Sequence, residues 1–240
     1  MRDLVEAKFK EYTENIPQNH DFKVWLAKSN LWGWIYSCFT AQGQNISKPC
    51  VVDLLEGTLR DEAPLSCYSF VQAFKEISKD MQEEISMQSS PSSELYKRWA
   101  RMLGCEEYRR TNPVVYEFGL IPCHFNAINE ELDDAFRRYK ISKQDSLEAA
   151  IILFLDLIKI YPFDDESIDM ALIALMYCLY SLGYPLPELG LKEDEFNKLI
   201  SQYMDEAESY EEFYNHFLKS LYNRLDSVVL FEKQALAQEV

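Results

Sequence analysis

Apolar residues recur at intervals of three and four along almost the whole chain, which is the spacing of one face of an α-helix. The pattern predicts helices over residues 4–12, 22–40, 65–85, 125–139, 145–160, 167–182, 193–206 and 210 to the mid-230s. Two further helices have clear end signals. One lies between Ser47 and Gly57, and the other follows the serine-proline segment at 89–93 and ends at Gly104.

One segment breaks the helical period. In YRRTNPVVYEFGLIPC, residues 108–123, β-branched and aromatic residues gather around Pro113 and Gly119, which is typical of a strand or hairpin. The expected fold is therefore all-α, a helical bundle with one short β-hairpin between its N-terminal and central helices. Only seven glycines in 240 residues also argue against an all-β architecture, which needs many tight turns.

The charge of the chain disfavours two classes of binding partner. The net charge of -16 argues against nucleic acid, whose phosphates are held mainly by Lys and Arg, and against anionic membrane surfaces. The N-terminal stretch MRDLVEAKFKEYTENI lacks the apolar run of a signal peptide, so a cytoplasmic location is expected. The six cysteines are scattered without a C-x-x-C pair, and we expect reduced core thiols.

The segment IYPFDDESIDM, residues 160–170, carries the candidate chemistry. The turn Tyr161-Pro162-Phe163 is followed within six residues by four carboxylates: Asp164, Asp165, Glu166 and Asp169. Acidic side chains in a first helical turn are favoured by the helix dipole, and Ser167 is a good cap for a helix beginning at Ile168. Helix capping, a metal site and a catalytic loop all remain open at this point.

A helix ending in Tyr161-Pro162-Phe163, an acidic turn and a buried helix closing on Gly183-Tyr184-Pro185 resemble the Fic/Doc (Fido) family. In that family the loop has the form H-P-F-x-D/E-G-N-G-R. The resemblance covers about residues 25–190. It implies a Fic-like domain over 1–190 including the N-terminal helices, with residues 191–240 as a helical extension packing on it.

The resemblance assigns a role to each loop position, and most of the residues do not suit it. The family's histidine is a general base, whereas Tyr161 is a phenol, which ordinarily titrates with a pKa of about 10. Asp169 stands where an arginine neutralises phosphate. Among the positions with a chemical role, Asp165 alone matches, at the acidic position that holds magnesium. Neither ATP nor Mg²⁺ is therefore an expected cofactor.

Two segments upstream also resemble the family. Val114-Val115-Tyr116 looks like the flap hairpin, which aligns a target segment by strand pairing. The segment SCFTAQGQNISKPCVVDLLEG resembles the inhibitory segment, whose glutamate pairs with the loop arginine. Its best match here is Gln42, followed by Gly43.

Two functions follow as hypotheses. The first is a degenerate Fic protein without AMP-transferase activity that serves as a protein-binding or regulatory module for a protein or peptide, with a homodimer also possible. The alternative is a divergent nucleotidyl or phosphoryl transferase, in which Asp165 holds a metal and Asp164 acts as the base.

Overall fold

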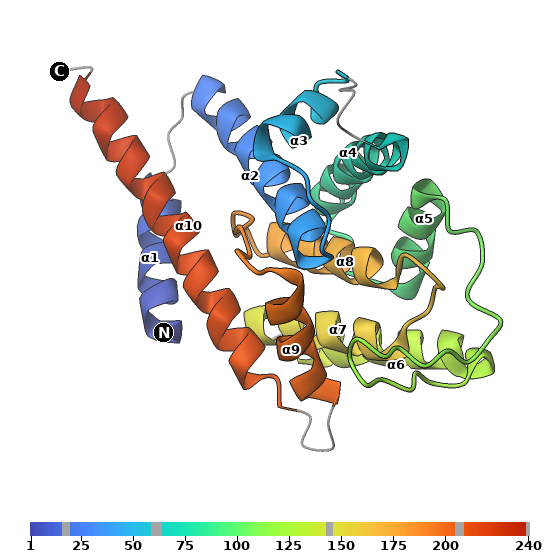
Figure 1. The fold of residues 1–240 in the computed structure, drawn as a ribbon. Coiled ribbons are helices and arrows are strands. Elements are labelled where there is room, and N and C mark those ends of the chain that lie inside the picture. Colours follow the sequence, from blue (N-terminus) through green and yellow to red (C-terminus); the bar gives the residue numbers. More distant parts are fainter. Residues whose placement is uncertain (16–19, 59–63, 143–145, 205–208, 239–240) are drawn as a thin grey trace.

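The computed structural model describes residues 1–15, 20–58, 64–142, 146–204 and 209–238, whose regular elements are helices joined by loops (Figure 1). Within these residues the elements are α1 (Arg2–Asn15), α2 (His20–Ala41), α3 (Lys48–Leu55), α4 (Leu65–Ser86), α5 (Ser93–Leu103), a 3₁₀ turn (Phe125–Ala127), α6 (Ile128–Ile141), α7 (Ser146–Ile160), α8 (Ser167–Ser181), α9 (Glu193–Met204) and α10 (Glu211–Gln238). The predicted all-α fold is confirmed.

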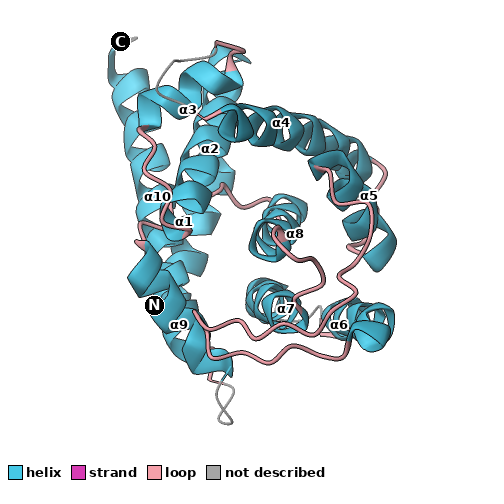
Figure 2. Ribbon diagram, turned by 45° about the vertical axis from the view of Figure 1, so that its right-hand side comes forward, coloured by secondary structure: helices cyan, strands magenta, loops and turns pink. Residues whose placement is uncertain are grey.

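Helix α8 forms the centre of the bundle. Figure 2 shows α7 and α8 almost end-on in the middle, with α2, α4, α5, α6 and α9 around them. Every residue from Met170 to Leu179 is buried, as a helix that is apolar on all sides requires. None of the described helices combines the length and apolar character needed to cross a bilayer. The loop between α7 and α8 therefore emerges from the core of the bundle.

The predicted caps of two helices are confirmed. The Ser47 hydroxyl accepts a hydrogen bond from the backbone N–H of Cys50 at 3.3 Å and begins α3. Gly104 ends α5 in the left-handed region, at φ +101°, where a side chain would be strained. Helix α5 is consequently fixed at its C-terminal end beside the start of α8.

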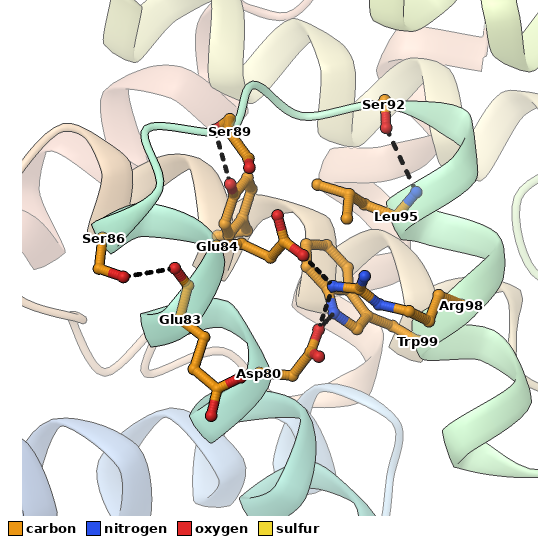
Figure 3. A network of polar contacts seen from close by, with 10 residues as sticks. Asp80, Glu83, Glu84, Ser86, Ser89, Ser92, Leu95, Arg98 and Trp99 are labelled. Atoms are coloured by element: carbon orange, nitrogen blue, oxygen red, sulfur yellow. Dashed lines mark hydrogen bonds and ion pairs between the residues drawn. The ribbon is translucent and has the colours of Figure 1, made fainter.

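A polar network joins α4 to α5 (Figure 3). The Arg98 guanidinium donates to Asp80 at 2.6 Å and to Glu84 at 2.5 Å, and the Trp99 indole N–H donates to Asp80 at 2.7 Å. A hydrogen bond from Ser89, followed by the contact with Arg98, lowers the pKa of Glu84. These contacts hold α5 against α4, so both helices present fixed faces to α8.

The C-terminal helix packs on the N-terminal ones. Helix α10 runs along α1 (Figure 1), and Lys8 pairs with Asp226 at 2.9 Å. Arg224 of α10 donates to Ser29 and Asn30 of α2, each at 2.7 Å. The division of the chain at residue 190 stays a prediction.

The predicted hairpin is reduced to one antiparallel bridge. Val115 and Leu120 exchange both backbone hydrogen bonds, at 2.9 and 3.0 Å, around a turn with Gly119 at φ +63°. Pro113 and Pro122 flank the pair and have no N–H to donate, which explains why the ladder does not extend. We call residues 114–121 the flap.

Candidate functional site

The loop of residues 161–166, called here the acidic loop, is closed by a serine. The Ser167 hydroxyl accepts from the N–H of Phe163 at 2.8 Å and donates to its carbonyl at 2.7 Å. The prediction that Ser167 caps a helix beginning at Ile168 is wrong. Helix α8 begins at Ser167, and Glu166 occupies the N-cap position, where its side chain makes no capping hydrogen bond to the first turn. The Ser167 hydroxyl therefore bonds the backbone of the buried Phe163 and does not cap the N–H groups of the first turn of α8.

A buried arginine holds the other end of the acidic loop. Arg109 is 2% exposed, and its Nε donates to the carbonyl of Tyr161 at 2.6 Å. One terminal nitrogen donates to the carbonyls of Cys123 at 2.5 Å and Ile160 at 3.2 Å, and the other to that of Thr111 at 2.6 Å. The Ile160 carbonyl lies at the end of α7 and accepts no hydrogen bond from within the helix. The Arg109 cation supplies a donor for it and interacts favourably with the negative end of the helix dipole.

Arg109 thus connects the two ends of the 109–123 segment to the acidic loop. Its own backbone N–H also donates to the carbonyl of Pro162 at 2.9 Å. The sequence indicates Arg109 only as a residue near the flap. Two of its partners, Ile160 and Tyr161, lie 51 and 52 residues away in the sequence, and no local pattern indicates them.

Tyr161 adopts a rare backbone conformation. Its φ is +50°, in the left-handed region, which costs a residue with a side chain about 1–2 kcal/mol. Hydrogen bonds from Arg109 and to the carbonyl of Leu157 maintain it. Burial, with smaller contributions from Glu117 and Asp165, raises the pKa of the phenol. The hydroxyl is therefore protonated at neutral pH and cannot take a proton from another group.

Asp169 contacts Gln42, which lies 127 residues earlier. The Gln42 amide nitrogen donates to Asp169 Oδ1 at 2.6 Å and to the carbonyl of Cys38 at 3.2 Å. Gln42 is fixed at the end of α2 because Gly43 turns the chain at φ +73°. Burial raises the pKa of Asp169 from 3.8 to about 7, the Gln42 hydrogen bond opposes this rise, and Glu166 adds to it.

The remaining carboxylates make this end of α8 strongly negative. Asp164 and Asp165 are exposed, and Glu166 accepts from the Cys105 thiol at 3.4 Å. Burial, followed by the charge of Glu166, raises the pKa of Cys105 to about 12. In the described part of the chain, none of these carboxylates nor Asp169 forms an ion pair. The uncompensated charge favours cations and repels phosphate.

No metal centre is formed by the described residues: they contain no group of three or more His, Cys, Asp or Glu side chains arranged to hold an ion. Asp165, the candidate magnesium ligand, lies exposed before the first turn of α8. A metal there would have to draw most of its ligands from water or from a bound molecule.

The flap presents apolar side chains to solvent. Val114, Tyr116 and Ile121 are 48%, 85% and 77% exposed, whereas Val115 is 7% exposed and packs in the core with Phe118. Successive side chains of an extended segment point to opposite sides, so Val115 faces the core while Val114 and Tyr116 face solvent. The side chains of Val114 and Tyr116 are thus available to a partner, and Val115 offers almost none of its side-chain surface.

Comparison by sequence finds no matching protein-family model and no matching curated protein. By structure, the chain is similar to a Fic domain containing signaling protein from Bacteroides thetaiotaomicron, with a TM-score of 0.81, 14% identity, and 96% of this chain and 98% of that chain covered. It is also similar to Fic-1 from C. elegans, with a TM-score of 0.79, 16% identity and coverages of 98% and 73%. A Fic family protein from Desulfovibrio desulfuricans gives a TM-score of 0.61, 11% identity and coverages of 98% and 75%. The chain therefore has the fold of Fic-domain proteins.

Proposed function

We propose that this chain is a Fic-fold protein that does not transfer AMP from ATP and that binds a protein or peptide partner through the flap and the acidic loop. The observation that carries the proposal is the contact between Gln42 and Asp169. At the position where the resemblance implies a glutamate paired with a phosphate-binding arginine, an amide donates to a partly buried carboxylate.

Electrostatics support the loss of nucleotide chemistry. Helix N-termini bind phosphate when backbone N–H groups and basic side chains converge there. At the start of α8 a triphosphate would meet Asp169 and Glu166 instead, with Asp164 and Asp165 beside them. Ionised carboxylates repel nearby phosphate groups strongly when both are partly buried. The residues present do not fit a nucleotide bound with its phosphates at this helix.

The proton acceptor is lost as well. Transfer to a hydroxyl needs a base that titrates near the working pH, and a protonated phenol at Tyr161 does not serve. The flap is nevertheless exposed and is tied to the acidic loop through Arg109. A partner segment beside the flap would therefore contact apolar side chains and a negative loop together, which suits a segment carrying basic residues.

The exposed tyrosine of the flap provides the test of partner binding. Proteins captured from lysate by the wild-type chain are identified and purified, and their affinities are measured for wild type, Tyr116→Ala and Ile141→Ala. Ile141 is 75% exposed at the end of α6 and serves as the matched control. We expect Tyr116→Ala to weaken a flap-bound partner about tenfold or more, with Ile141→Ala and both melting temperatures unchanged. Equal affinities for all three chains would contradict the proposal.

A further inference from the structure

A cavity of about 470 Å³ lies beside the Gln42–Asp169 contact, which is a suitable size for a small organic group. Its walls come from the end of α2, the face of α4, the C-terminal end of α5 and the start of α8. Because α5 is fixed by its network with α4 (Figure 3), the cavity lies between braced helices. We call it the acidic cavity.

The lining combines apolar rings with carboxylates. Phe39 and Phe70, whose ring centroids are 5.2 Å apart, form an aromatic wall, and Glu166 and Asp169 contribute carboxylates. The amide of Gln44 adds a further polar group. Aromatic faces and carboxylates both attract organic cations, whereas carboxylates disfavour anions.

No side chain of the described chain neutralises these carboxylates. Arg101 is the basic residue among the lining residues, but it is exposed and forms no ion pair with Glu166 or Asp169. Within the part of the chain that the structure describes, Glu166 receives only the weak thiol donor of Cys105, and Asp169 only the Gln42 amide. A cationic partner stabilises partly buried carboxylates such as these, and here an external one can supply the charge.

We propose that the acidic cavity binds an arginine side chain of a partner polypeptide, with its guanidinium at Glu166 and Asp169 and its aliphatic stem against Phe39 and Phe70. This inference rests on the proposed function and names the chemistry that the partner must carry. Arginine suits the cavity better than lysine, because a planar guanidinium stacks on rings, is more weakly hydrated and can bond two carboxylates at once. The net charge of -16 attracts a basic segment from a distance.

The test uses small probes, so that it does not depend on identifying the partner. N-acetyl-arginine N-methylamide, its neutral isostere N-acetyl-citrulline N-methylamide and the lysine analogue are titrated into the whole protein, and binding is followed by NMR chemical shifts. We expect saturable binding of the arginine probe at millimolar concentrations, with shifts at residues lining the cavity. The citrulline and lysine probes should bind at least about tenfold more weakly. Equal binding of either analogue overturns the assignment.

Variants locate the site. Glu166→Gln and Asp169→Asn should each weaken the arginine probe about tenfold, since each removes one charge-assisted hydrogen bond. Ala73→Leu should weaken it by occupying the cavity from α4. Glu130→Gln removes the same charge on α6, away from the cavity, and should leave the affinity unchanged. The assignment is overturned if Glu166→Gln, Asp169→Asn and Ala73→Leu all bind the arginine probe with the wild-type affinity. If one of these three variants does not fold, the other two make the same comparison.

The arginine titration is repeated with Tyr116→Ala. Unchanged affinity there is expected and shows that the cavity acts independently of the flap. If wild type fails to bind the arginine probe, the cavity assignment falls. The proposed function would stand in that case, because it is tested separately by partner affinity and by nucleotide binding.

Discussion

Replacing Arg109 with methionine lowers the free energy of unfolding by about 3 kcal/mol or more, the largest loss expected from any substitution near the site. Methionine fills much of the volume but leaves the carbonyls of Tyr161 and Cys123 without the Arg109 donor, and that of Ile160 with only the weak thiol donor of Cys123. For a chain of this size about 2–4 °C is expected per kcal/mol, so the melting temperature should fall by about 6–12 °C.

The neighbouring arginine is a matched control for this substitution. Arg110 is exposed and, among the described residues, pairs only with Glu107, three residues earlier, and such surface pairs contribute little. Arg110→Met should change the melting temperature by about 1 °C or less. Hydrogen exchange should increase in both the 109–123 segment and the acidic loop of Arg109→Met, because one side chain holds both. A melting temperature equal to that of Arg110→Met would show that Arg109 does not hold the loop.

Asp169→Asn makes the protein more stable at pH 8. Burial raises the pKa of Asp169 to about 7 in the folded state, against 3.8 unfolded, so the folded chain retains its proton more strongly. The contribution of this group to stability is therefore full below about pH 4, declines as the pH rises towards 7, and stays low above that. Asparagine keeps an oxygen for the Gln42 amide and carries no charge, so we expect a gain of about 1–2 kcal/mol at pH 8.

The gain should shrink as the pH falls from 7 to 5, where the wild-type carboxyl is protonated in the folded state, and should vanish only near pH 4, where it is protonated in the unfolded state as well. Glu166, Cys38 and Cys105 also face Asp169 electrostatically, but the two thiols do not titrate in this range because burial raises their pKa values. Asp164→Asn changes an exposed carboxylate and is the control. Chemical denaturation of the three chains between pH 5 and 8 makes the comparison. A constant difference between wild type and Asp169→Asn across that range would contradict the assigned pKa.

The helices could be predicted from the sequence because their signals are local. Apolar spacing located eight of the ten described α-helices, and the end signals Ser47 and Gly104 located the other two, since both kinds of signal lie within a few residues of the helix they indicate. The flap was located as well. Its single bridge follows from two prolines whose effect on a short ladder could have been recognised in advance.

Contacts between distant segments could not be predicted in this way. Arg109 is one of many arginines in the sequence until the fold brings it to the end of α7, and Val115 cannot be told from Val114 until the core is placed. Ser167 has the residue type of a cap and closes the acidic loop instead. The pairing of Gln42 with Asp169 depends on the packing of α2 beside α8, which no local period records.

Nucleotide binding tests the central claim most directly, namely that the acidic loop no longer serves ATP. The melting temperature of the wild-type chain and of Asp165→Ala is measured with ATP and Mg²⁺ or Mn²⁺ up to millimolar concentrations. A ligand at a hundred times its dissociation constant adds about 2.7 kcal/mol, or about 5–10 °C here. The account predicts no saturable rise for either chain. A saturable rise in the wild type that Asp165→Ala abolishes would contradict it and would favour a metal-dependent transferase.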